Sequence, residues 1–342
     1  MMNRLFFSIF IVAGLVSGCK LNKEPVETSG NPLFDGQWYA DPEIAVFGDK
    51  YWIFPTFSAE FDRQVHFDCF SSPDLVNWTK HENIIDTAEV KWAHRAMWAP
   101  CAVENNGKYF FFFGANDIQR PVSKWWNPEI HSVNDVGGIG VAVADHPAGP
   151  YKDYLGEPLI GEVHNGAQPI DQFVFKNKDG QWYIIYGGWG KCNIAKLKDD
   201  FTGFIPFEDG TVFKDITPEG YVEGPVIFIK NDRYYFMWSE GNWTTDNYQV
   251  AYGKSDLLFG PYERMGTVLQ SDSSIATGAG HHSVLNYPDT NDWYIFYHRR
   301  PIPNESPNHR VVCVDRMYFI ADGTIEPIKM TFEGVDERPL NQ

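Results

Sequence analysis

The chain has 342 residues, with 28 Lys and Arg against 45 Asp and Glu, so its formal net charge is −17. A balance this acidic argues against nucleic acid as a partner, and a hydrophobic content of 43% argues against intrinsic disorder. Aromatic residues are abundant, with 12 Trp, 17 Tyr and 26 Phe against 13 Leu. Because helices favour Leu whereas strands favour aromatic and β-branched residues, this composition predicts an all-β chain.

The N-terminal residues predict an export signal. Arg4 precedes an apolar run over 5–16 that is too short to span a bilayer comfortably. The run ends in Leu15-Val16-Ser17-Gly18-Cys19, which resembles a bacterial lipobox, in which cleavage precedes the Cys and the Cys is lipidated. We therefore expect a lipoprotein signal peptide over 1–18 and a polar tether over 19–31. A plain secretory signal with an incidental Cys is the alternative.

These N-terminal features also predict the location of the protein. We expect it in the bacterial cell envelope, on the periplasmic side or at the cell surface, with the membrane contacted only through the lipid anchor at Cys19.

A repeat dominates the folded domain that we expect over residues 32–342. Short aromatic strands recur at intervals of 58, 73, 52 and 59 residues, each after a polar turn that follows another apolar strand. These strands begin at Tyr51, Tyr109, Trp182, Tyr234 and Trp293. Strand, turn and strand form a β-hairpin, and further strands follow, as over 140–145 and 250–255. Five such units predict a five-bladed β-propeller, whereas the alternative, a β-sandwich, does not explain the repeat.

Four cysteines lie in the expected propeller: Cys69, Cys101, Cys192 and Cys313. Their spacing does not match the paired CxxC pattern of zinc sites, and a chain of this length can fold without disulfides. We expect buried thiols, although an oxidising periplasm would permit one bridge.

Ionisable residues recur at the start of the first strand of several blades. Counting back ten or eleven residues from the aromatic strands gives Asp41, Asp171, Glu223 and His282, the last with His281 beside it. First strands line the channel of a propeller, so these side chains should converge at one end of its axis. Carboxylates held close together shift one another's pKa values. Two carboxylates in different environments suit glycoside hydrolysis, in which one protonates the leaving oxygen and the other activates water.

The aromatic surplus also fits a carbohydrate substrate, because sugar C–H faces stack on Trp and Tyr. Several Trp residues lie near loops that lead into or out of the blades: Trp38, Trp92, Trp98, Trp189 and Trp243. Packing between blades is the alternative for each. A long excursion over 115–138, with Trp125, Trp126 and His131, is expected to shape specificity or, alternatively, to pack on the outer surface.

Over essentially residues 32–335, the chain resembles glycoside hydrolase family 43, five-bladed propeller enzymes that release arabinofuranose or xylose from plant polysaccharides. The motifs that carry the resemblance stand one per blade: Ala40-Asp41-Pro42-Glu43, Trp98-Ala99-Pro100, Pro169-Ile170-Asp171, Glu223-Gly224-Pro225 and Gly278-Ala279-Gly280-His281-His282-Ser283. The resemblance implies an inverting enzyme with Asp41 as the general base and Glu223 as the general acid. It implies that Asp171 orients the acid and tunes its pKa. Inversion implies room for a water between base and acid, roughly 6.5–9.5 Å.

The resemblance also implies roles around these carboxylates. His281 matches a channel His that often faces a bound metal ion, commonly calcium, through water; a simple hydrogen-bonding role is the alternative. Arg310 sits where many members carry an Arg near the acid and the substrate. We expect substrate contacts from Trp98, Trp189, His282 and Arg310, no cofactor for the chemistry, and a structural Ca2+ in the central channel. Gln172 departs from the family, which usually has Pro after the third-blade Asp.

The expected function is that of an inverting, exo-acting arabinofuranosidase or xylosidase. An endo-arabinanase or exo-galactanase on the same fold is an alternative. A non-catalytic glycan-binding propeller is disfavoured because all three carboxylates are present. A sucrose- or fructan-cleaving relative is disfavoured because its Trp-x-Asn-Asp-Pro and Arg-Asp-Pro motifs are absent from the sequence.

Overall fold

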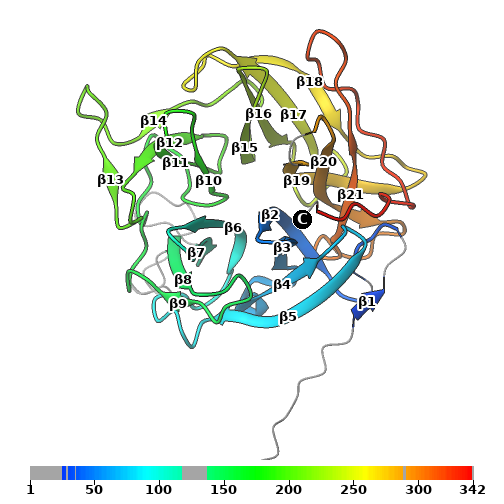
Figure 1. Ribbon diagram of the computed structural model, residues 1–342, viewed down its shortest axis with the longest axis horizontal. Helices are drawn as coiled ribbons and strands as arrows, with labels where there is room; N and C mark the ends of the chain where they lie inside the picture. Colours follow the sequence, from blue (N-terminus) through cyan, green and yellow to red (C-terminus); the bar gives the residue numbers. More distant parts are fainter. Residues whose placement is uncertain (1–24, 28–29, 35, 118–136, 288–289, 341–342) are drawn as a thin grey trace, which may run out of the picture.

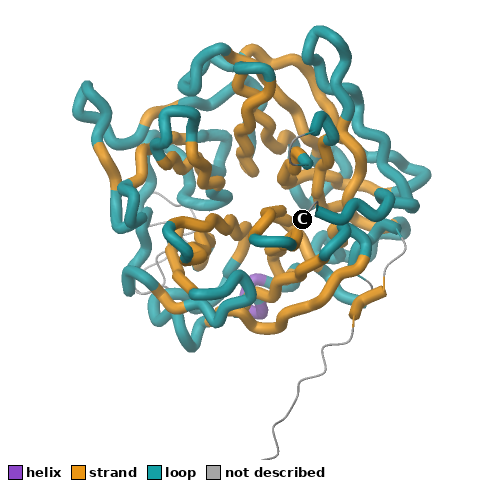
Figure 2. Tube along the Cα trace, viewed as in Figure 1, coloured by secondary structure: helices purple, strands orange, loops and turns teal. Residues whose placement is uncertain are grey.

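Five antiparallel sheets surround a central axis, and each sheet is one blade (Figure 1). The computed structural model describes residues 25–27, 30–34, 36–117, 137–287 and 290–340. Within these ranges the elements are strands, apart from a short 3-10 helix, η1 (Phe61–Arg63), as Figure 2 shows. The predicted all-β, five-bladed propeller is confirmed.

The strands follow one another from blade to blade in chain order. Blade 1 contains β2 (Tyr39–Phe47), β3 (Lys50–Phe57), β4 (His66–Ser72) and β5 (Asn77–Asp86), with β1 (Pro25–Glu27) added at its outer edge. Blade 2 contains β6 (Trp98–Asn105), β7 (Lys108–Ala115), β8 (Gly138–Ala144) and β9 (Lys152–Asp153). Blade 3 contains β10 (Phe173–Lys176), β11 (Trp182–Tyr186), β12 (Asn193–Leu197), β13 (Phe204–Ile205) and β14 (Lys214–Asp215). Blade 4 contains β15 (Glu223–Lys230), β16 (Arg233–Glu240), β17 (Gln249–Ser255) and β18 (Glu263–Leu269). Blade 5 contains β19 (Ala276–Asn286), β20 (Trp293–Pro301) and β21 (Val311–Met317).

The hydrophobic core is divided between the blades. Each of five clusters among the described residues joins two neighbouring blades, including blades 5 and 1. Between blades 1 and 2, for example, the Phe67 and Phe111 rings meet edge to face with centroids 5.0 Å apart. Large flat side chains fill the space between twisted sheets at high packing density, which explains the aromatic surplus.

A left-handed residue recurs within or just before the first strand of every blade. The five positions, with their φ angles, are Asp41 (47°), Ala99 (45°), Asp171 (55°), Gly224 (62°) and His281 (35°). In four of the five blades a break in the strand register accompanies this residue. Such a β-bulge re-aims a side chain, and the strained conformation persists because the surrounding blade holds it. The functional residues are therefore placed by a backbone feature that repeats with the blade.

Both ends of the described chain help to close the ring. The N-terminal segment runs beside β21: the Leu33 N–H donates to the Val312 carbonyl at 2.9 Å, and Asn31 accepts the Val314 N–H at 2.8 Å. At the other end, the Arg338 N–H donates to the Asp74 carbonyl in blade 1 at 2.7 Å. Because β1 pairs with β5, part of the predicted 19–31 tether is an outer strand of blade 1.

The four cysteines of the propeller are buried thiols, as predicted. The described residues include no helix of the length and apolar character that a membrane span requires.

Candidate active site

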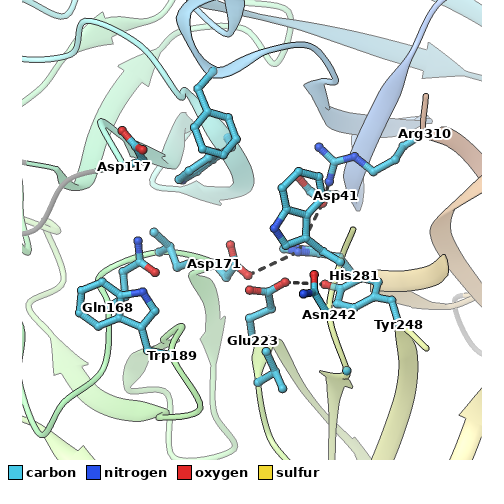
Figure 3. Close-up of a pocket in the computed structure, with 16 residues that line it drawn as sticks. Asp41, Asp117, Gln168, Asp171, Trp189, Glu223, Asn242, Tyr248, His281 and Arg310 are labelled. Carbon is cyan, nitrogen blue, oxygen red and sulfur yellow. Dashed lines mark hydrogen bonds and ion pairs between the residues drawn. The ribbon is translucent and has the colours of Figure 1, made fainter. Parts of the chain in front are cut away.

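The three predicted carboxylates line one cavity of about 530 Å³ (Figure 3). Asp41 and Glu223 come from the first strands of blades 1 and 4, and Asp171 comes from the segment just before β10 in blade 3. The cavity is also lined by Trp98, Trp189, His281 and Arg310, all of which the sequence singled out. Residues up to 269 positions apart in the chain thus meet at one end of the channel.

Asp41 lies among positive and hydrogen-bonding groups. Its Oδ1 is 3.3 Å from Arg310 Nη1, 3.2 Å from His298 Nδ1 and 3.5 Å from His281 Nδ1. Burial disfavours its charged form, but the Arg310 guanidinium and the two histidines outweigh burial and hold the pKa of Asp41 well below its usual range. Asp41 is therefore ionised at neutral pH, as a general base must be.

Glu223 has the opposite character. It is surrounded by buried groups, and its Oε1 accepts a hydrogen bond from the Tyr248 hydroxyl at 2.9 Å. Burial, together with the nearby charge of Asp41, raises the pKa of Glu223 to about 7, against the lowering effects of Tyr248 and Arg310. A substantial fraction of Glu223 is therefore protonated at neutral pH and able to donate a proton.

Asp171 lies between Glu223 and His281. Its Oδ2 accepts the Gly224 backbone N–H at 3.1 Å and is 3.5 Å from His281 Nδ1 (Figure 3). Burial and the neighbouring carboxylates of Glu223 and Asp41 raise the pKa of Asp171 well above its usual range. Since Asp171 accepts the N–H of Gly224, which follows Glu223, it can orient the Glu223 side chain, and the two carboxyls titrate as a pair.

His281 and His282 face different surroundings. His281 lines the cavity beside both Asp residues, whereas His282 is 2% exposed and is not among the cavity residues. Successive strand residues point to opposite faces, so the strand presents one member of the pair to the cavity. The expected substrate contact from His282 is therefore not supported. Burial lowers the pKa of His282 to about 3, and both ring nitrogens lack a hydrogen-bond partner among the described residues.

The described residues do not form a metal cage. Within them, no group of three or more His, Cys, Asp or Glu side chains is placed to hold a metal ion. The neutral, buried ring of His282, with two unsatisfied nitrogens, is compatible with a water or a hydrated ion in the channel. The predicted role of His281 toward a metal stays a prediction.

Aromatic side chains form the walls of the cavity. Trp98 packs edge to face on Phe61, with ring centroids 4.9 Å apart, and the Arg310 guanidinium lies 5.2 Å from the Trp243 ring. Trp189 is 43% exposed and lies, with Asp117, on the side of the cavity away from Arg310 and Tyr248 (Figure 3). These surfaces suit the apolar faces of a sugar ring.

The other Trp residues named from the sequence are placed elsewhere. Trp38 stacks on His309 with centroids 4.3 Å apart and Trp92 stacks on Phe113 at 5.8 Å, and neither is among the cavity residues. The excursion with Trp125, Trp126 and His131 lies largely outside the described residues, so its predicted effect on specificity stays a prediction.

Gln172 takes on a structural task at the position where the family usually has Pro. Its side-chain amide donates to the Ala99 and Phe112 carbonyls, which ties blade 3 to blade 2. Asp171 still lines the cavity although Gln172, and not Pro, follows it.

Sequence reasoning did not single out Phe61, Asp117, Gln168 and Asn242, which line the cavity, or Tyr248 and His298, which contact Glu223 and Asp41. His298 directly follows the aromatic run Tyr294-Ile295-Phe296-Tyr297 and is buried. A polar residue that continues a buried strand could have been recognised from the sequence as a candidate site residue. Tyr248 precedes β17, and one more Tyr among 17 carries no such signal.

Comparisons with known proteins agree with this geometry. The sequence model of glycosyl hydrolases family 43 matches residues 29–325. A β-D-galactofuranosidase of Aspergillus niger is 40% identical over 326 residues, which cover 92% of this chain and 88% of that protein. A xylosidase/arabinosidase of Bacteroides ovatus is 26% identical, with 91% of this chain and all of that protein covered.

A solved structure shares the fold. It is a family 43 β-xylosidase/α-arabinofuranosidase from a compost microbial metagenome, in complex with xylotriose and in a calcium-free form. Its TM-score is 0.71 at 26% identity, and the match covers 89% of this chain and 98% of that one. Together with the carboxylates in the cavity, these matches show that the chain belongs to glycoside hydrolase family 43.

Proposed function

We propose that the protein is an inverting, exo-acting glycosidase that releases a terminal arabinofuranose or xylose from plant polysaccharide or oligosaccharide. The observation that carries the proposal is the pairing of an ionised Asp41 with a Glu223 whose pKa is near 7, in one cavity. Asp41 removes a proton from the attacking water while Glu223 protonates the departing oxygen. Asp171 holds the acid in place through the Gly224 N–H.

Galactofuranose is the second candidate sugar, and the 40% identity to a β-D-galactofuranosidase favours it. α-L-Arabinofuranose and β-D-galactofuranose share the configuration of their five-membered ring and differ in the exocyclic group on C4. That group is CH2OH in arabinofuranose and CH(OH)CH2OH in galactofuranose. A site built for one ring therefore accepts the other wherever the exocyclic group has room, whereas xylopyranose presents a six-membered ring.

A substrate panel tests the proposal. Nitrophenyl α-L-arabinofuranoside, β-D-xyloside, β-D-galactofuranoside and β-D-galactopyranoside would be assayed with the wild-type protein and with Asp41→Asn as a blank. Proton NMR of the first product anomer distinguishes inversion from retention. Release of single sugars from the end of an oligosaccharide supports exo action, whereas internal cleavage of arabinan favours an endo-arabinanase. Binding to glycans without hydrolysis of any of them would favour the non-catalytic alternative.

We also propose that the protein is held at the cell envelope by a lipid on Cys19. Six positions separate Cys19 from Pro25, where β1 begins, and an extended chain of that length reaches about 20 Å. A lipid at Cys19 would therefore keep the outer edge of blade 1 close to the membrane surface.

A structural Ca2+ in the central channel completes the proposal. The chemistry of Asp41, Asp171 and Glu223 requires no cofactor, so a hydrated ion near the unsatisfied His282 ring would act on stability. Metal analysis of the purified protein, with melting temperatures before and after chelation, tests this part separately from activity.

A further inference from the structure

A stacked Tyr–His pair connects the two carboxylates. The Tyr248 hydroxyl donates to Glu223 Oε1 at 2.9 Å, and its ring stacks on the His298 imidazole with centroids 5.7 Å apart and planes inclined by 12°. His298 Nδ1 in turn lies 3.2 Å from the Asp41 backbone N and 3.2 Å from Asp41 Oδ1. Tyr248 and His298 are each 1% exposed, so neither can change rotamer freely.

The His298 contact supports a strained residue. Asp41 adopts a φ of 47°, a conformation that non-glycine residues take only when their surroundings hold it. The contact of His298 Nδ1 with the backbone N and the carboxylate of Asp41 supplies one such restraint. One aromatic pair thus contacts the acid at its carboxylate and the base at its backbone.

The last blade leaves space for this pair. A Cβ atom on Gly280 would overlap the ring of Tyr248, so the position must be Gly for the ring to lie where it does. Gly280 belongs to the Gly278–Ser283 motif of blade 5. The side chain that requires a glycine there is Tyr248, which precedes β17 in blade 4.

We propose that Tyr248 is a positioning residue that aims the Glu223 carboxyl at the leaving oxygen and stabilises the carboxylate that Glu223 becomes as it donates its proton. This inference rests on the proposed role of Glu223 as the general acid. A hydroxyl donor stabilises the carboxylate more than the carboxylic acid, so it assists the step in which Glu223 gives up its proton.

Other charged groups act on Glu223 from the neighbouring blades. Asp41 of β2 raises its pKa, as burial does, and Arg310 before β21 lowers it. Asp171 lies before β10 and His281 lies on β19, both at the same cavity. None of these groups is altered by removal of the Tyr248 hydroxyl, so the change in the pH profile reports that single hydrogen bond.

Tyr248→Phe tests the inference, since it removes one oxygen and keeps the stacked ring. The pH dependence of kcat/KM would be measured on an oligosaccharide and on a dinitrophenyl glycoside of the same sugar. Loss of the donor raises the pKa of Glu223, so the alkaline limb moves to higher pH by about one unit. We expect kcat on the oligosaccharide to fall about tenfold, whereas kcat on the dinitrophenyl glycoside, whose leaving group needs little protonation, stays near wild type.

Tyr262→Phe is the matched control. Tyr262 is also a buried residue of blade 4, and its hydroxyl donates to the Leu258 carbonyl at 2.7 Å, outside the cavity. Both variants should lose stability, but the control should keep the wild-type pH profile. An unchanged alkaline limb in folded Tyr248→Phe, or the same shift in Tyr262→Phe, would overturn the inference.

A second variant displaces the hydroxyl without deleting it. Gly280→Ala pushes the Tyr248 ring from its place, and we expect it to reproduce the upward shift of the alkaline limb. Glu223→Gln separates the inference from the proposed function. If Glu223→Gln retains activity on the dinitrophenyl glycoside while Tyr248→Phe shifts nothing, the acid assignment stands and the role of Tyr248 fails.

Discussion

The Arg310 guanidinium lies against the Asp41 carboxylate, with Nη1 3.3 Å from Oδ1, and both residues are 7% exposed. Arg310 is itself fixed by its Nε, which donates to Ser58 Oγ at 2.9 Å. A buried carboxylate stays ionised only when a partner of this kind compensates for lost hydration. The pair therefore keeps the proposed base ready to accept a proton.

Replacement of Arg310 should impair this base. In Arg310→Met the pKa of Asp41 rises, so the acidic limb of kcat/KM moves to higher pH and the rate at the optimum falls by about 10²-fold or more. Arg316→Met is the control, because Arg316 pairs with Asp292 at 2.8 Å, outside the cavity. An acidic limb that stays in place would contradict the role given to Arg310.

Substitution of the acid should depend on the leaving group. Glu223→Gln is expected to lose about 10³-fold or more on a natural glycan and far less on an activated aryl glycoside, whose phenolate leaves without full protonation. Asp41→Asn should be inactive on both, because water attack is needed in each case. Equal losses for Glu223→Gln on the two substrates would mean that the acid is another residue.

Asp171 should act through Glu223. Asn tolerates the left-handed conformation found at position 171, where φ is 55°, so Asp171→Asn changes charge with little effect on the backbone. Because the two carboxyls titrate as a pair, loss of the Asp171 carboxyl should displace the alkaline limb of kcat/KM while natural substrates are slowed. A limb that does not move would show that Asp171 acts by orientation alone.

The core between blades 1 and 2 should be sensitive to cavities. Phe111 is fully buried and packs against Phe67 and Tyr151, so Phe111→Ala should lower the free energy of unfolding by about 3–5 kcal/mol. Leu257→Ala, at a side chain that is 64% exposed, should change it by less than about 0.5 kcal/mol. Chemical denaturation of the two variants gives the comparison.

The proposed anchor can be tested in cell fractions. Wild-type protein should appear in the membrane fraction with a mass that corresponds to a lipidated N-terminal Cys19, and Cys19→Ala should appear in the soluble fraction. An unmodified Cys19, or cleavage at another position, would leave an exported enzyme without an anchor.

Much of the architecture follows from the sequence because it repeats. The alternation of aromatic strands and Gly, Asn or Asp turns depends on neighbours within a few residues, and five copies of it define five blades. The shared position of Asp41, Asp171 and Glu223 within their blades was enough to predict that they meet, because equivalent positions of a propeller lie around one axis.

What only the tertiary structure decided depends on contacts between distant residues. The sequence predicts a His pair, but the bulge at His281 and the packing around it decide that His281 reaches the cavity and that His282 is buried apart from it. The sequence contains Tyr248 and His298 as ordinary core residues, and the packing of blades 4 and 5 brings them to Glu223 and Asp41. These contacts arise from the way in which whole blades pack, and a local pattern of residue types carries no record of that packing.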